Sequence, residues 1–214
     1  MKTDKTIIFD FDGTIASTLV TLAEIYNRIA PKFRCEQVKI EDAEKLRSKR
    51  PQEFMRDYGV STVKLPFLVL KARSELYKQI NDIKPQTGIC SALKQIDDMG
   101  YVLGILTSNS KRNTHSFLLK NDLSDVFDFV YTGTHVFSKH RKIKHILKEK
   151  QIQKNTVIYV GDETRDIEAA KKVDIPIIAV SWGFNKKKTL QNQNPEFIVD
   201  EPNELVNIIK EINK

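Results

Sequence analysis

The chain has 214 residues, of which 40% are hydrophobic and 29% charged, and a formal net charge of +7. A chain of this length and composition can bury a real core, which excludes a disordered, collagen-like or disulfide-scaffold protein. The positive charge is scattered, with its densest run at residues 186–188. This pattern favours a solvated surface over a nucleic-acid interface, and it suits an enzyme whose substrate is an anion.

Short apolar runs with strand character alternate with segments of helical periodicity along most of the chain. The runs cover residues 6–9, 102–106, 129–131, 157–160 and 176–180, with a further candidate at 197–199. This alternation predicts an α/β fold, a parallel sheet covered by helices on both faces. Sheets of this kind bind ligands at the carboxyl ends of their strands. The residues that follow each predicted strand are therefore the candidates for a functional site.

The first predicted strand ends in two carboxylates, Asp10 and Asp12, which Gly13 follows. Positions i and i+2 of a strand point the same way, so both carboxylates can reach one pocket. Such a pair suits nucleophilic attack combined with acid–base work, and it needs a cation to offset the repulsion. For this motif alone, an ordinary solvated turn rich in Asp and Gly is an equally serious interpretation.

The region after this motif interrupts the alternation, because residues 18–82 contain no convincing strand. Apolar residues fit one helical face over 19–33 and another over 65–80. Pro51 is expected to open a short helix that Gly59 ends. We therefore predict two parts, an α/β core of residues 1–15 and 84–214 and a helical cap of residues 16–83.

The predicted strands at 102–106 and 157–160 also end in polar residues. Thr107, Ser108 and Asn109 follow the first, where hydroxyls and free N–H groups before a helix can bind an anion. Asp162 and Asp166 follow the second, and hard oxygen ligands on a turn suit Mg²⁺. Each motif alone is also explained by an ordinary helix N-cap. Two acidic strand ends in one α/β chain favour a shared site.

Taken in order, these motifs resemble the four motifs of the haloacid dehalogenase (HAD) superfamily. They are residues 10–14, the strand ending in Thr107, a lysine near Lys139, and Gly161 with Asp162 and Asp166. The resemblance covers nearly the whole chain and implies a Rossmann-like parallel sheet core. The helical insert and residues 179–184 look like the phosphoglycolate phosphatase-like branch, whose cap is α-helical.

The resemblance implies a role for each motif residue. Asp10 would be the nucleophile that forms an aspartyl phosphate, and Asp12 would protonate the leaving oxygen and then activate water. The implied Mg²⁺ ligands are Asp10, Asp12 through its main-chain carbonyl, and Asp162. Asp166 would support the metal waters or the lysine. To act as an acid, Asp12 needs a pKa above its usual value of about 3.9, and we hypothesise that burial beneath the cap raises it.

The resemblance also implies a phosphate-binding set. Thr107 and Lys139 would grip the phosphoryl oxygens, the backbone amides of Phe11 and Ser108 would help, and Asn109 would touch substrate. The family lysine is often followed by proline, whereas His140 follows Lys139 here.

Lys142 and Lys144 are therefore alternatives to Lys139. Lys139 is preferred because it directly precedes a helical stripe at 143–147. In the insert, Arg47 and Arg50 are candidates for reading a second anionic group of the substrate, although a basic helix end explains them equally simply.

These observations predict a cytoplasmic, Mg²⁺-dependent phosphatase of small phosphate esters, monomeric or homodimeric, with no nucleic-acid or membrane partner. The two cysteines, Cys35 and Cys90, are far apart in sequence and expected as reduced thiols. No run reaches the roughly 20 apolar residues of a membrane span, and no signal peptide is evident. A phosphomutase of the same superfamily shares every motif and remains the main alternative.

Two other readings are less favoured. A dehalogenase would need neither the second aspartate nor Mg²⁺, so Asp12, Asp162 and Asp166 argue against it. A non-catalytic module that binds nucleic acid or a partner rests only on the net charge.

Overall fold

The computed structural model describes residues 2–39, 46–133 and 138–212. Its central feature is one sheet of six parallel strands in the order β3-β2-β1-β4-β5-β6. The strands are β1 (Thr6–Phe9), β2 (Val102–Leu106), β3 (Phe129–Tyr131), β4 (Val157–Gly161), β5 (Ile177–Val180) and β6 (Phe197–Val199). All six lie where the apolar runs predicted strands, and the expected α/β fold is confirmed.

Strand β1 lies at the centre of the sheet, paired on one side with β2 and on the other with β4. Thr6 is in register with both Val102 and Val157. The strand order reverses here, because β2 and β3 extend from one edge of β1 and β4 to β6 from the other. The carboxyl ends of β1, β2 and β4 therefore adjoin at the topological switch point, where open α/β sheets bind ligands.

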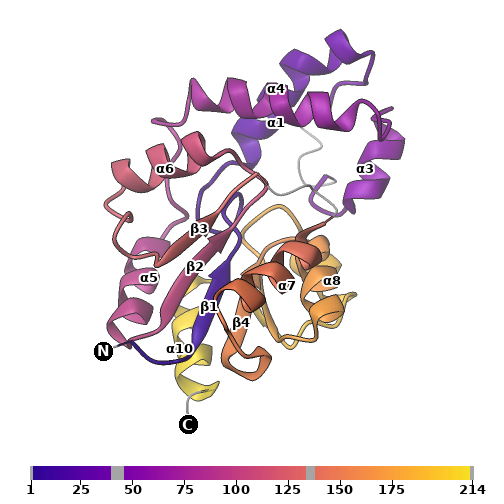
Figure 1. The fold of residues 1–214 in the computed structure, drawn as a ribbon. Helices are drawn as coiled ribbons and strands as arrows, with labels where there is room; N and C mark the ends of the chain where they lie inside the picture. The colour runs from indigo at the N-terminus through magenta and orange to yellow at the C-terminus, as the bar shows by residue number, and fades with distance from the viewer. Residues whose placement is uncertain (1, 40–45, 134–137, 213–214) are drawn as a thin grey trace.

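Helices cover both faces of the sheet, as Figure 1 shows. One layer packs with Phe9 and Ile105 in a shared apolar core, and the other packs with Ile8 and Tyr159. The first layer contains α5 (Ile89–Asp98), α6 (Lys111–Lys120) and α10 (Pro202–Ile212). The second contains α7 (Lys139–Glu149), α8 (Thr164–Val173) and α9 (Lys187–Gln191), and the short 3-10 helix η3 (Lys154–Thr156) precedes β4. Alternate residues of β1 thus point to opposite cores, as a strand buried on both faces requires.

Between β1 and α5 the chain forms a helical segment beyond the carboxyl ends of the strands (Figure 1). Its members, called the inserted helices below, are α1 (Leu19–Ile29), η1 (Ala30–Phe33), α3 (Pro51–Asp57) and α4 (Leu65–Tyr77). As predicted, Pro51 begins α3 and Gly59, at φ +67°, follows it. Ala16 bridges Pro85, so the chain leaves the sheet layer and returns to it at one place. The described part of residues 18–82 contains no strand.

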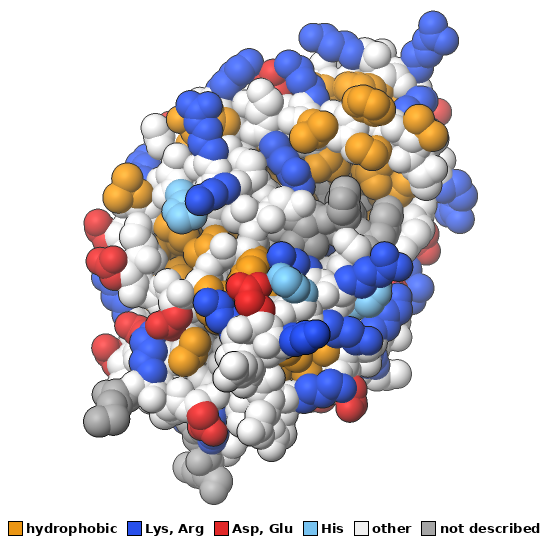
Figure 2. Space-filling model, in the orientation of Figure 1, with side chains coloured by type: hydrophobic (Ala, Val, Ile, Leu, Met, Phe, Trp, Pro, Cys, Tyr) orange, Lys and Arg blue, Asp and Glu red, His pale blue; other side chains and the backbone are white. Residues whose placement is uncertain are grey.

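Some surface and chain properties predicted from the sequence can be compared directly with the structure. Cys35 and Cys90 are both free. No helix in the described ranges is long and apolar enough to cross a membrane. Figure 2 shows Lys and Arg side chains spread over the visible face, with apolar side chains gathered over the inserted helices.

Candidate active site

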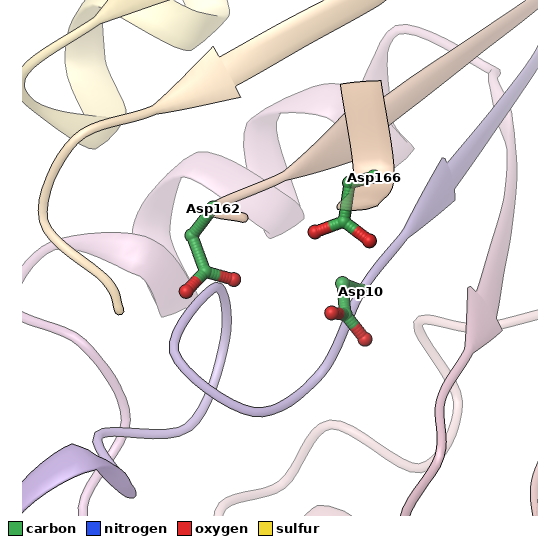
Figure 3. Close-up of side chains that lie close together, drawn as sticks. All are labelled: Asp10, Asp162 and Asp166. Atoms are coloured by element: carbon green, nitrogen blue, oxygen red, sulfur yellow. The ribbon is translucent and has the colours of Figure 1, made fainter. Parts of the chain in front are cut away.

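Three buried aspartates meet where β1 and β4 end. Asp10 directly follows β1, Asp162 directly follows β4, and Asp166 lies in the first turn of α8. Each contributes a carboxylate oxygen to a group in which all three oxygens lie within 4.8 Å of one another. Figure 3 shows the three side chains close together at the ends of the two strands. The shared register of β1 and β4 produces this convergence from residues that are more than 150 positions apart.

Asp162 is fixed by protein donors on both carboxylate oxygens. The Thr14 hydroxyl donates to Oδ1 at 2.7 Å, and the backbone N–H of Phe184 donates to Oδ2 at 2.6 Å. Two glycines leave space for the Asp162 carboxylate, because a Cβ on either Gly13 or Gly183 would stand 2.2 Å from Asp162 Oδ2. Since such a distance is far inside van der Waals contact, only glycine fits at either position.

Lys139 is the lysine that the structure brings to this cluster. Its ammonium group lies 2.8 Å from Asp10 Oδ2 and 2.5 Å from Asp166 Oδ1, and its side chain is 3% exposed. Asp166 is itself oriented by the backbone N–H of Glu163, which donates to Oδ2 at 3.1 Å. Lys142 instead lies 4.8 Å from the Tyr131 ring centre, and Lys144 is exposed.

The cluster carries more negative charge than its own cations neutralise. Its buried or nearly buried charged groups are the carboxylates of Asp10, Asp162, Glu163 and Asp166 and the cations of Lys139 and Arg165. Burial raises the pKa of Asp10, and burial together with Glu163 raises the pKa of Asp162 well above its ordinary value. A bound divalent cation would reverse both effects by favouring the ionised carboxylates.

The donor set fits Mg²⁺. Three carboxylates at the end of a sheet supply only oxygen ligands, which this hard ion prefers. Burial would by itself lower the pKa of Lys139, but Asp10 and Asp166 outweigh it, so its net pKa is raised well above the ordinary value. Lys139 therefore remains charged beside the cluster and serves as its fixed cation. The side chain of Asp12 is not part of this group, which leaves its main-chain carbonyl as the expected ligand atom.

Asp12 is held beside the cluster by Asn109. The Asn109 amide donates to both Asp12 carboxylate oxygens at 3.1 Å. Asn109 is positioned in turn, because its Oδ1 accepts hydrogen bonds from the Ser110 backbone and the Asn113 side chain. Burial, followed by repulsion from Asp10, raises the pKa of Asp12 to about 7. This value matches the hypothesis that Asp12 is partly protonated at neutral pH.

The remaining predicted phosphate-binding residues lie around the same point. Thr107 is buried at the end of β2, and its hydroxyl oxygen accepts the Asn109 backbone N–H at 2.9 Å. The Phe11 backbone N–H donates to Asp10 Oδ1 at 2.8 Å, and its ring packs against Phe117. Ser108 lines an adjoining cavity.

The two arginines proposed to read the substrate lie elsewhere. Arg47 donates from Nε to the Gly183 carbonyl at 3.0 Å and from Nη2 to the Ser181 carbonyl at 2.7 Å. It thus connects the inserted helices to the loop after β5. Arg50 is exposed and caps α3, where its backbone N–H donates to Glu53. Neither residue lines the adjoining cavity.

Two other arginines, which the sequence analysis did not single out, reach the site. Arg165 is paired with Glu163 and lies within electrostatic range of Asp10. It stands between Asp162 and Asp166 in the fourth motif, so its position was visible in the sequence. Arg73, from α4, donates to the Ser108 carbonyl. Its only sequence signal is a cation directly after Ala72 on an otherwise apolar helix face.

A cavity of about 340 Å³ separates the inserted helices from the strand ends. Asp12, Ser108 and Asn109 form its floor, and side chains from α1, α3 and α4 form much of its walls. A larger hollow of about 500 Å³ lies between α3 and the α7–α8 layer. That hollow reaches Lys139 and Arg165 but not Asp12, so the smaller cavity is the one that opens onto the acid–base carboxyl.

Comparisons with known proteins agree with this architecture. Residues 7–180 match the model of the haloacid dehalogenase-like hydrolase family. The chain is 33% identical over 210 residues to a phosphoglycolate phosphatase from Synechococcus elongatus, covering 96% of this chain and 97% of that protein. A pyrophosphatase from Bacillus mycoides is 21% identical, with 97% and 98% covered. A predicted phosphatase from Clostridium acetobutylicum superposes with a TM-score of 0.83 at 24% identity, with 97% and 98% covered.

Proposed function

The chain belongs to the haloacid dehalogenase-like hydrolase family, and we propose that this phosphatase hydrolyses a small phosphate monoester with Mg²⁺ through an aspartyl-phosphate intermediate. The observation that carries the proposal is the buried group of Asp10, Asp162 and Asp166 with Lys139 in contact with two of them. Such a group combines a nucleophile with the charge neutralisation that an anionic phosphate needs.

The first step forms a bond between a carboxylate oxygen of Asp10 and phosphorus while the bond from phosphorus to the ester oxygen breaks. Asp12 gives its proton to that departing oxygen, so the product leaves as an alcohol. In the second step Asp12, now ionised, takes a proton from water, whose oxygen attacks phosphorus and releases Asp10. A pKa of about 7 suits a carboxyl that must both donate and accept a proton near neutrality.

The other residues position the phosphoryl group and hold the metal. Asp10, Asp162 and the Asp12 carbonyl would bind Mg²⁺, which when bound neutralises charge on the phosphoryl oxygens. Lys139, with Thr107, would hold phosphoryl oxygens at the end of β2. Asp166 would keep the Lys139 ammonium in place through their 2.5 Å contact.

The inserted helices are proposed to act as a cap over this site. Arg73 and Arg47 connect them to the sheet layer on opposite sides of the cavity, through the carbonyls of Ser108 and of the loop after β5. A cap held in this position would exclude bulk water from the aspartyl phosphate and restrict which alcohol fits beside Asp12. Phosphoglycolate, the substrate in the name of the Synechococcus relative, is the first reference ester.

The test is hydrolysis of p-nitrophenyl phosphate and phosphoglycolate with Mg²⁺ and with EDTA. We expect phosphate release that requires Mg²⁺ and falls at least about a thousandfold in Asp10→Asn, because the nucleophile is lost. Asp174→Asn, at a side chain that is 94% exposed, is the matched control and should keep full activity. Activity that survives Asp10→Asn would refute the mechanism. Transfer of the phosphoryl group to a sugar without release of phosphate would indicate a mutase instead.

A further inference from the structure

The cavity beneath the inserted helices is lined mainly by apolar side chains. Its floor is Asp12, the residue proposed to protonate the departing oxygen, so whatever occupies the cavity is the alcohol part of the ester. The apolar wall residues are Leu19, Leu22, Ala23, Tyr26, Val38, Leu46, Pro51, Phe54, Val69, Ala72, Leu76 and Phe184. All but Phe184, which lies in the loop after β5, come from α1, α3, α4 and the segments joined to them.

The cations on this wall already have partners. Lys49 lies 2.5 Å from Asp57, and Arg165 is paired with Glu163. Arg73 donates to the Ser108 carbonyl. Arg73 and Arg165 each keep one buried N–H, at Nε, without a partner among the described residues. The described wall therefore offers two spare buried N–H groups in a mainly apolar space. A polyhydroxylated sugar would leave its hydroxyl groups without partners here, at a cost for each.

The walls are also fixed in this position. Arg73 connects α4 to the strand end, and its carbonyl accepts a hydrogen bond from the Asn113 side chain of α6 at 2.9 Å. Arg47 connects the other side of the inserted helices to the loop after β5. The cavity therefore lies between layers that are already joined, and its volume of about 340 Å³ belongs to that joined state. Pockets of about 300–1,000 Å³ hold medium-sized organic ligands.

We propose, on the basis of the phosphatase function above, that the preferred substrate is the phosphate ester of a medium-sized, mainly apolar alcohol with few hydrogen-bond acceptors. Glycolate is too small to fill this space and would leave water against the apolar walls. An apolar alcohol displaces that water, and its binding energy also holds the ester oxygen next to Asp12.

The experiment compares kcat/KM for ethyl, butyl and hexyl phosphate with that for phosphoglycolate and glycerol 3-phosphate. The alkyl alcohols are similar leaving groups, so chain length changes mainly the contact with the walls. Each buried methylene is worth about 0.8 kcal/mol, which is roughly fourfold in kcat/KM. We expect a rise of at least about tenfold from ethyl to hexyl phosphate, and hexyl phosphate above phosphoglycolate.

Val69→Thr and Val63→Thr provide a matched pair. Both replace a methyl group by a hydroxyl of similar size, but Val69 lines the cavity whereas Val63 is 74% exposed. The readout is the ratio of kcat/KM for hexyl over ethyl phosphate, which does not depend on how much protein is folded. We expect the ratio to fall roughly threefold or more in Val69→Thr, because a polar group then faces the chain. It should be unchanged in Val63→Thr.

The outcomes separate the two proposals. Equal kcat/KM along the alkyl series, or phosphoglycolate above hexyl phosphate, would overturn the apolar specificity and leave the phosphatase function intact. Equal ratios in wild type and Val69→Thr would show that another surface binds the chain. No Mg²⁺-dependent phosphate release from any ester, p-nitrophenyl phosphate included, would overturn both proposals.

Discussion

Lys139 is a buried cation on which both the stability and the activity of the protein are expected to depend. Its side chain is 3% exposed and lies between Asp10 and Asp166. Replacing it with Met keeps the volume but leaves the two carboxylates without their cation. We expect Lys139→Met to lose about 3 kcal/mol in the free energy of unfolding near pH 8 in EDTA, where carboxylates tend to ionise. Phosphatase activity should also fall, because the phosphoryl oxygens lose a positive partner.

Urea unfolding and phosphate release measure both effects. Lys144→Met, at an exposed position on the same helix α7, is the control and should change the free energy of unfolding by less than about 0.5 kcal/mol. If Lys144→Met or Lys142→Met abolished activity while Lys139→Met kept it, the phosphate-binding lysine would have been misassigned.

Asp12 should make the stability of the metal-free protein depend on pH. Its pKa is about 7 in the folded protein, against 3.8 when unperturbed, so the folded state holds the proton more tightly than the unfolded state does. This tighter proton binding adds to the free energy of unfolding. The added stability is fully present below about pH 4 and is lost as the pH rises to about 7. Asn cannot ionise, so Asp12→Asn should lack this loss.

Urea unfolding in EDTA at about pH 5 and pH 8 tests this expectation. The free energy of unfolding of Asp12→Asn, relative to wild type, should rise by on the order of 2 kcal/mol between the two pH values. A constant difference would mean that Asp12 titrates near its ordinary pKa. The comparison cancels the pH dependence that wild type and variant share.

At the scale of elements, the turn after β1 depends on how closely it approaches Asp162. Gly13 and Gly59 both have positive φ, +84° and +67°, but only Gly13 lies against another residue. We expect Gly59→Ala to cost about 1 kcal/mol, from backbone strain alone. Gly13→Ala should cost at least about 2 kcal/mol more and reduce activity strongly, because its Cβ must displace the Asp162 carboxylate.

Thermal or urea unfolding of the two variants separates strain from crowding, since both positions have a positive φ and only Gly13 is crowded. Equal costs with full activity would show that the turn can move away from Asp162 without consequence. The loop after β5 is under the same constraint, because a Cβ on Gly183 would also stand 2.2 Å from Asp162. Two separate loops thus meet on this one carboxylate, the loop after β1 through Thr14 and the loop after β5 through Gly183 and Phe184.

At the scale of the whole molecule, the sequence predicts the sheet well because each strand is a continuous apolar run next to a polar strand end. Asp10 and Asp162 were found for that reason. Contacts made by the inserted helices were not predictable in the same way. Arg47 was one of two candidates for binding a second anionic group of the substrate, yet it donates to main-chain carbonyls of the loop after β5. The direction of a long side chain on a helix end depends on the docking of two layers, which local periodicity does not encode.

The same limit explains why Arg73 was missed and why the cavity could not be predicted. Apolar residues on α1 and α4 have the spacing of a helix core, and several do pack there, as Ile25 and Leu68 do. Others, including Leu22 and Val69, face the cavity. Periodicity identifies an apolar face but not whether a neighbouring helix or an open space lies against it.

The proposed metal site should stabilise the entire fold, because its ligands come from distant parts of the chain that are together only when the protein is folded. A ligand present at about 100 times its Kd adds about 2.7 kcal/mol to the free energy of unfolding. For a chain of this size, that corresponds to a rise in Tm of roughly 5–10 °C. We expect excess Mg²⁺ to raise the Tm of wild type relative to EDTA, and Asp162→Asn to lose most of that rise.

Asp174→Asn, at an exposed carboxylate outside the cluster, should respond like wild type. An equal Mg²⁺ response in all three proteins would place the ion elsewhere, because a surface-bound ion would not distinguish Asp162 from Asp174.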